Sequence, residues 1–144
     1  MYQQILVATD GSELSARAVE TAARLAALTG AQLEVISVKE PFPYSAISEM
    51  QPVPPQEFYD AQERLASERI AAAVDMARAR GVQASGASVE ALHPWEAILE
   101  RAKTKGCDLI VMASHGRRGI GALLLGSETQ KVLTHSAVPV LVIR

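Results

Sequence analysis

The sequence predicts an α/β fold, in which an open, doubly wound sheet of five parallel strands has helices on both faces. Two observations support this prediction. Short runs rich in Val, Ile and Leu alternate with longer segments whose apolar residues recur at helical spacing. Residues 109–113 are also apolar at every position, as in strands buried on both faces. Because strand–helix–strand units join parallel strands by right-handed crossovers, the alternation predicts a parallel sheet.

Strand, helix and strand follow one another within the first 38 residues. A β-prone run at residues 4–9 ends at Asp10-Gly11-Ser12, which is typical of a turn followed by a helix N-cap. From Glu13, apolar residues recur on one helical face as far as Gly30, where a C-terminal cap belongs. Strand character returns at residues 33–38.

A long loop separates this unit from the rest of the chain, because five prolines between residues 39 and 56 exclude a helix interior or a central strand. The alternation then continues. Pro94 suits the first position of a helix, and Ser127 with Gln130 forms an S-x-x-Q capping box. The predicted elements are a helix to about residue 80, a weaker strand at 82–90, a helix from 94 that Gly106 closes, the buried strand at 109–113, a helix from 127 and a last strand at 138–143.

Length and composition limit the class of protein. The 144 residues fit a single domain, residues 1–144, and 49% apolar with 21% charged residues excludes intrinsic disorder. A net charge of -2 gives no cationic field for nucleic acid or anionic lipid. The single Cys107 cannot form an internal disulfide, and no signal segment or run of roughly 20 apolar residues occurs. We therefore expect a cytoplasmic protein with no nucleic-acid or membrane partner.

Two strand endings resemble each other: Thr9-Asp10-Gly11 after the first strand and Ser114-His115-Gly116 after the fourth. If these strands are neighbours at which the winding reverses, the two endings face each other across the crevice where open α/β sheets bind ligands. The sequence therefore predicts a binding site at this point.

Glycines between the fourth strand and the last helix favour a phosphate cradle over a flexible surface loop, because strand–loop–helix settings let backbone N–H groups approach phosphate closely. They are Gly116, Gly119, Gly121 and Gly126. The segment is not a P-loop, since Ser127 and Glu128 stand where Lys and Ser/Thr are needed. The dinucleotide fingerprint is absent after the first strand, which disfavours NAD and FAD.

The segment resembles the universal stress protein family, whose nucleotide-binding members carry G-x2-G-x9-G-[ST] after the fourth strand. Here the motif reads Ala113-Ser114-His115-Gly116, nine residues, then Gly126-Ser127, with only the first glycine replaced. The resemblance extends to the first strand with its Asp10-Gly11-Ser12 ending and to the last strand. It implies a Rossmann-like fold of the adenine nucleotide alpha hydrolase type.

The resemblance also implies ATP, with Mg²⁺, as the ligand. Adenine is then expected near the Val38 backbone, ribose and phosphates near Asp10, and the phosphates at Gly116, Gly126 and Ser127. Further matching contact positions are Ala8, Thr9, Met112 and Glu128. Asp10 and Ser127 have the chemistry for these roles, but each can equally cap a helix, and capping does not exclude binding.

Ala113 is the one departure from the motif. Its methyl costs about 1 kcal/mol, or blocks the pose, if the backbone lies at positive φ or touches the ribose, and costs little at strand angles. We expect weakened rather than abolished binding.

Other polar residues of the segment have two interpretations each. His115 either donates to a phosphate or hydrogen-bonds the backbone of its loop. Arg117 and Arg118 either clamp phosphates or stay solvated, and solvation is favoured for at least one of them. Ser114 beside His115 is interpreted as a coincidence, because consecutive side chains commonly diverge. We expect no dedicated metal site and no catalytic residue, hence no enzyme beyond a slow ATPase.

The predicted function is that of an ATP-binding stress-response or regulatory protein, in which nucleotide orders the loop from Gly116 to Gly126 and alters a surface seen by a regulatory protein partner. The alternative is a nucleotide-free dimeric interaction module. In either case the last strand should lie at a sheet edge, where a partner chain can cover its unpaired backbone. We expect a homodimer through Val140, Leu141, Val142 and Ile143.

Overall fold

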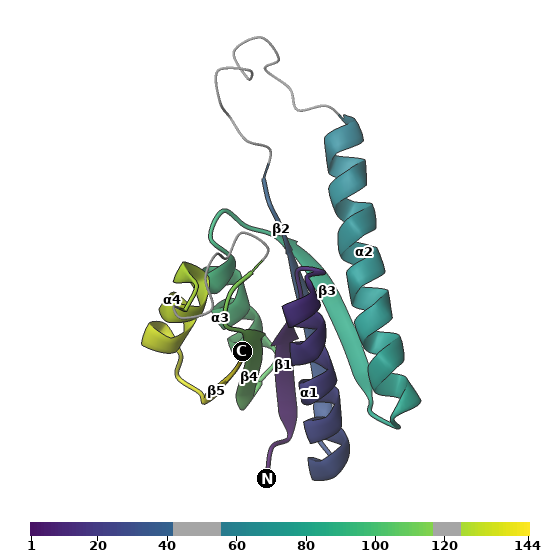
Figure 1. Ribbon diagram of the computed structural model, residues 1–144, viewed down its shortest axis with the longest axis vertical. Helices are drawn as coiled ribbons and strands as arrows, with labels where there is room; N and C mark the ends of the chain where they lie inside the picture. Colours follow the sequence, from purple (N-terminus) through teal and green to yellow (C-terminus); the bar gives the residue numbers. More distant parts are fainter. Residues whose placement is uncertain (42–55, 117–124) are drawn as a thin grey trace.

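Five parallel strands form one sheet in the order β3-β2-β1-β4-β5, which confirms the predicted fold class (Figure 1). The computed structural model describes residues 1–41, 56–116 and 125–144. The strands are β1 (Gln4–Ala8), β2 (Gln32–Lys39), β3 (Ala84–Glu90), β4 (Leu109–Ala113) and β5 (Val140–Ile143). The helices are α1 (Glu13–Thr29), α2 (Gln56–Ala79), α3 (Pro94–Thr104) and α4 (Ser127–His135).

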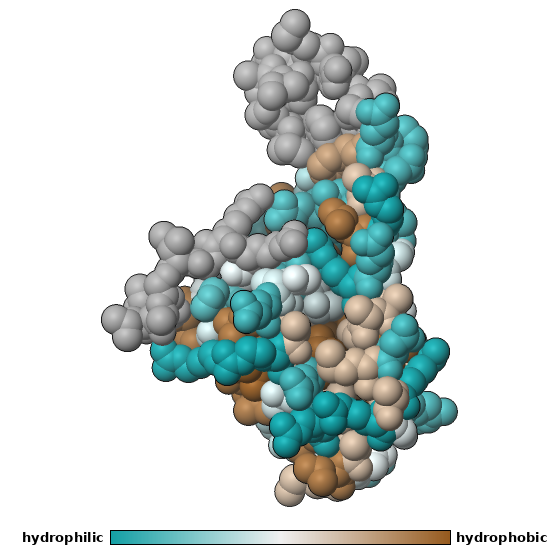
Figure 2. All heavy atoms as spheres, turned by 45° about the vertical axis from the view of Figure 1, so that its right-hand side comes forward, coloured by the Kyte–Doolittle hydropathy of each residue, from teal (hydrophilic) through white to brown (hydrophobic). Residues whose placement is uncertain are grey.

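Two helical layers cover the two faces of the sheet. Alternate strand residues point to opposite faces, so Ile5 and Val7 belong to the core cluster that includes residues of α1 and α2, whereas Leu6 belongs to the cluster that includes residues of α3 and α4. Figure 1 shows α1 and α2 on one side and α3 and α4 on the other. Figure 2 turns the α2 side forward, where hydrophilic residues cover much of the outer side of this helix. The core therefore consists of two aliphatic clusters separated by the sheet.

Most predicted helix signals are confirmed. The Ser12 hydroxyl caps α1 by accepting from Ser15 N at 3.2 Å, and Gly30 ends α1 in the left-handed region at φ 76°. Pro94 is the first residue of α3. Across the described ranges, no helix combines the length and apolarity that a membrane crossing requires.

The capping box predicted for the last helix is wrong. The N-cap of α4 is Gly126, Ser127 is already helical, and the Gln130 side chain donates to Leu125 O at 3.0 Å instead of reaching the cap. Gly126 is the N-cap because its backbone is extended and its carbonyl accepts from Gln130 N at 3.0 Å, while its own N–H donates to Ser114 O at 2.7 Å. The helix therefore begins without a side-chain cap from its N-cap residue.

A buried ion pair, which was not predicted from the sequence, joins α3 to the middle of the sheet. Glu34 in β2 is 1% exposed, and its Oε1 accepts from Arg101 Nη2 at 2.6 Å and from Arg101 Nε at 3.1 Å. The Ser85 hydroxyl of β3 donates to Glu34 Oε2 at 2.9 Å. Both carboxylate oxygens are thus hydrogen-bonded, as a buried charge requires.

Candidate functional site

The loops after β1 and β4 meet at the point where the winding of the sheet reverses. β1 lies between β2 and β4, and β1 pairs with β4 through Ile5, Leu6 and Val7. A Cβ atom at Gly116 would lie only 3.0 Å from Asp10 Oδ2. The two strand endings that the sequence singled out are therefore in contact, as predicted for a doubly wound sheet.

On the β1 side, hydrogen bonds hold the Thr9–Ser12 turn in a fixed shape. Asp10 Oδ1 accepts from Ser12 N at 2.9 Å, and Thr9 Oγ1 accepts from Gly11 N at 3.3 Å. The Thr9 and Ser15 hydroxyl oxygens lie 3.3 Å apart. Thr9 is buried, with its hydroxyl engaged at the start of α1. Of the two predicted site residues Thr9 and Asp10, Asp10 is the one whose side chain approaches the loop after β4.

On the β4 side, backbone contacts fix the start of α4. Gly126 N donates to Ser114 O, and the buried Thr129 hydroxyl donates to Ala113 O at 2.9 Å. A Cβ atom at Gly126 would lie 3.2 Å from His115 Cα and 3.3 Å from Ser114 O. Any side chain at Gly126 therefore presses on the β4 loop, which the sequence did not reveal.

The N-terminus of α4 has the chemistry of an anion site. Because Gly126 has no side chain, it cannot cap the first N–H groups of the helix, which begin at Ser127 and Glu128. These groups and the helix dipole favour a negative charge. Gly126 and Ser127 form the start of α4, and Gly116, which ends the described part of the loop after β4, approaches Asp10 in the loop after β1.

The remaining predicted positions lie at the carboxyl ends of the strands. Ala8, Val38 and Met112 all belong to the cluster on the α3 and α4 face. Ala113 ends β4 opposite Ile143, and no non-glycine residue of the described ranges has positive φ. Of the two conditions under which the Ala113 methyl would weaken binding, positive φ is therefore not met. Arg117, Arg118, Gly119 and Gly121, with most of the proline-rich loop, lie outside the described residues.

The interpretation of Ser114 and His115 as a mere sequence neighbourhood is wrong. Ser114 Oγ lies 3.2 Å from His115 Nδ1, because the bend after β4 brings the two side chains together. Ser114 is only 4% exposed, so a nucleophilic role for its hydroxyl is disfavoured. The contact orients the imidazole, and which of the two groups donates depends on the tautomer of His115.

Two contacts close to the site are not predicted from the sequence. Arg69 of α2 reaches the turn after β1, since a Cβ atom at Gly11 would lie 2.7 Å from its Nε. Glu128 Oε2 accepts from Trp95 N at 2.8 Å, which ties α4 to the start of α3. Both contacts join residues more than 30 positions apart, so spacing along the chain carries no signal of them.

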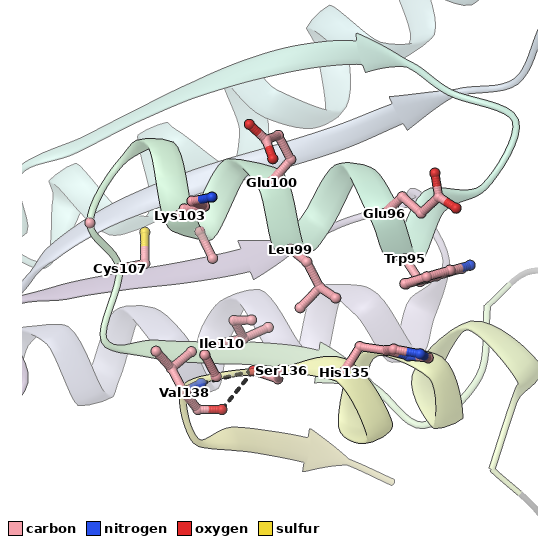
Figure 3. A pocket seen from close by; sticks show the side chains of 13 residues that line it. Trp95, Glu96, Leu99, Glu100, Lys103, Cys107, Ile110, His135, Ser136 and Val138 are labelled. Atoms are coloured by element: carbon pink, nitrogen blue, oxygen red, sulfur yellow. Dashed lines mark hydrogen bonds between the residues drawn. The ribbon is translucent and has the colours of Figure 1, made fainter.

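A cavity of about 580 Å³ lies away from these loops, between α3 and the segment from α4 to β5. Figure 3 shows Trp95 and Leu99 extending from α3 toward the α4 side. The Trp95 and His135 rings are stacked, with centroids 4.7 Å apart. Cys107 also lines this cavity and is buried. Within the described residues, no cluster of His, Cys, Asp or Glu could hold a metal ion.

Burial, with the nearby charges of Glu34 and Asp108, raises the pKa of the Cys107 thiol from 9.0 to about 11. As the pH rises, the thiol ionises in the unfolded chain before it ionises in the folded protein, and this ionisation favours the unfolded chain. The stability that the neutral buried thiol contributes is therefore fully present below pH 9 and is lost as the pH rises through 11. We expect the free energy of unfolding to fall by on the order of 1–2 kcal/mol over this range. Denaturant unfolding of wild type and Cys107→Ala between pH 8 and 11 measures it. Parallel pH profiles for the two proteins would contradict the prediction.

The fold and the paired loops define a doubly wound α/β protein with a ligand crevice at its switch point. The sequence matches the universal stress protein family over residues 1–144, and the chain belongs to this family. A universal stress protein of Thermus aquaticus is 33% identical over 144 residues, which cover all of both chains.

Solved structures show the same fold. The protein MJ0577 of Methanocaldococcus jannaschii superposes with a TM-score of 0.83 at 26% identity, covering 99% of this chain and 96% of that one. A universal stress protein in complex with cAMP superposes with a TM-score of 0.74 at 32% identity, covering 99% and 97%.

Proposed function

We propose that the chain binds an adenine nucleotide, ATP with Mg²⁺, in the crevice between the carboxyl ends of β1 and β4, and acts as a regulatory protein of the stress response in the cytoplasm. The observation that carries the proposal is the approach of Gly116 to the Asp10 carboxylate, where a Cβ atom would be 3.0 Å from Oδ2. Glycine at this position leaves the backbone open to a phosphate beside the carboxylate.

The residues of the crevice fit the parts of the nucleotide. Asp10 can accept hydrogen bonds from ribose hydroxyls or approach Mg²⁺, which when bound neutralises phosphate charge. Gly116, Gly126 and the N-terminus of α4 at Ser127 form the phosphate cradle. The other positions assigned to the site are Ala8, Thr9, Val38, Met112, Ala113, His115 and Glu128. The relative in complex with cAMP supports an adenine ligand.

Small molecules released from the purified protein on denaturation test this function. Mass spectrometry is expected to detect ATP, or calorimetry to detect its binding to the emptied protein. If no adenine nucleotide is released and none binds at millimolar concentration, the nucleotide-free interaction module takes the place of this proposal. AMP, ADP and cAMP titrated in parallel give the phosphate preference of the cradle.

We further propose a homodimer through the outer edge of β5. β5 is the last strand of the sheet order, so among the described residues one side of its backbone pairs with no other strand. Its residues are Val140, Leu141, Val142 and Ile143, of which Leu141 is 37% exposed. Sedimentation at micromolar concentration is expected to give a dimer for wild type and a larger monomer fraction for Leu141→Lys. A wild-type monomer at that concentration would contradict the proposal.

A further inference from the structure

The Glu128 side chain, from α4, caps the N-terminus of α3. His93 occupies the N-cap position and makes no side-chain cap hydrogen bond. Pro94 has no N–H, so Trp95 carries the first backbone donor of the helix. The Glu128 carboxylate accepts from this donor at 2.8 Å. A negative charge at the N-terminus of α3 is also favoured by the helix dipole.

A second contact links the same two helices at the other end of α4. His135, in the last turn of α4, stacks on Trp95 with an angle of 28° between the rings. Trp95 is therefore held by α4 at its backbone and at its ring. Figure 3 shows Trp95 and His135 facing each other at one end of the cavity between the helices. Any displacement of α4 acts on Trp95 through both contacts.

Glu128 also stands beside the proposed phosphate cradle. It is the second residue of α4, immediately after Ser127, and Gly126 precedes them as the N-cap. A carboxylate turned toward this N-terminus would compete with phosphate for the same N–H groups and would repel its charge. The bond to Trp95 N instead holds the carboxylate at α3. The N-terminus of α4 is thereby left to the ligand.

We propose that Glu128 is a positioning residue that couples the nucleotide site to α3. Its carboxylate stays on Trp95 N while phosphate occupies the N-terminus of α4, and nucleotide therefore strengthens the Glu128–Trp95 bond. Because the coupling between two sites is reciprocal, a change that weakens the Glu128–Trp95 hydrogen bond also weakens the binding of phosphate. This inference rests on the proposed function, since it needs a phosphate at α4, and it assigns α3 with Trp95 as the element that senses occupancy.

The opposite behaviour follows if Glu128 contacts the nucleotide directly, for example through Mg²⁺. The carboxylate would then leave Trp95 N when nucleotide binds, and the first backbone donor of α3 would be exposed. The two arrangements predict opposite changes at one atom, the amide hydrogen of Trp95. Hydrogen exchange at this amide, followed by NMR, therefore distinguishes them.

In wild type, saturating Mg-ATP is expected to slow exchange of the Trp95 amide at least fivefold, the lower end of ordinary coupling between sites. Adenosine, which has no phosphate, should leave the rate unchanged. In Glu128→Ala the amide should exchange fast with or without nucleotide. Glu96→Ala is the matched control, because Glu96 is an exposed carboxylate in the first turn of the same helix. This control should respond as wild type does.

Calorimetric titration of the same proteins with Mg-ATP separates the inference from the function on which it rests. Unchanged or faster Trp95 exchange in a wild-type protein that binds ATP overturns the coupling alone. A wild-type protein that binds no adenine nucleotide overturns both. Glu128→Gln keeps an accepting oxygen without the charge, so it should retain a smaller protection than wild type, and it replaces Glu128→Ala if that variant does not fold. A full response in either Glu128 variant would also contradict the coupling.

Discussion

Replacing Arg101 by Met is expected to lower the free energy of unfolding by about 3–5 kcal/mol, the usual effect of removing one partner from a buried ion pair. Glu34 is 1% exposed, and Arg101 supplies two of its hydrogen bonds. Without the guanidinium, the Glu34 carboxylate in β2 keeps, among the described residues, the single bond from Ser85. Chemical denaturation at neutral pH measures the loss.

A second substitution separates the lost charge pair from lost packing. The double variant Glu34→Leu with Arg101→Met has no uncompensated charge, and replacing a whole buried pair by apolar residues is often close to neutral. We expect the double variant to be more stable than Arg101→Met alone. An Arg101→Met protein within 1 kcal/mol of wild type would mean that solvent reaches Glu34 and that the pair does not hold α3 to the sheet.

Replacing Gly126 by Val is expected to abolish the stabilisation of the protein by ATP. At a free ATP concentration a hundred times the dissociation constant, a ligand specific for the native state adds about 2.7 kcal/mol. For a chain of this size that raises the melting temperature by roughly 5–10 °C. In Gly126→Val the β-branched side chain occupies the phosphate cradle and presses on His115 Cα, so the rise should be close to zero.

Gly126→Val also lowers stability without ligand, because its Cβ would be 3.3 Å from Ser114 O. A variant that leaves the contact between Gly126 and Ser114 unchanged is therefore needed beside it. Ser127→Ala serves, since Ser127 is not the N-cap and its loss removes no cap. Its melting temperature without ligand should match wild type, with an ATP affinity about tenfold lower. Equal ATP-induced shifts in all three proteins would place the nucleotide elsewhere.

The fold could be predicted from the sequence because its signals are local. Residues 109–113 are apolar throughout, and Pro94 and Gly30 mark helix ends by their own backbone preferences. The position of β4 beside β1 was a condition of the predicted site, and the strand order of the sheet meets this condition. The error at α4 is one of a single residue, because the first intrahelical bond is accepted by Gly126 O and not by the adjacent Ser127.

The site was predicted only in part, because some of its residues carry local signals in the sequence and others do not. Asp10 and Gly116 lie in short segments that follow strands, and the topology alone brings them together. The hydrogen bonds between Glu128 and Trp95 and between Arg101 and Glu34 depend on how α3 packs. The spacing of these residues in the sequence does not indicate that packing. Arg69 approaches Gly11 across a gap of more than 50 positions in the chain, through the packing of α2 beside α1.

Amide chemical shifts of the labelled protein, recorded by NMR during titration with Mg-ATP, test the central claim most directly, because they locate the ligand. We expect the largest changes at the backbone amides of Asp10, Gly116, Gly126 and Ser127, where the two loops meet. Changes centred on Leu99, Cys107 and Val138 instead, which line the cavity between α3 and β5, or no changes at saturating nucleotide, would contradict a nucleotide site at the switch point.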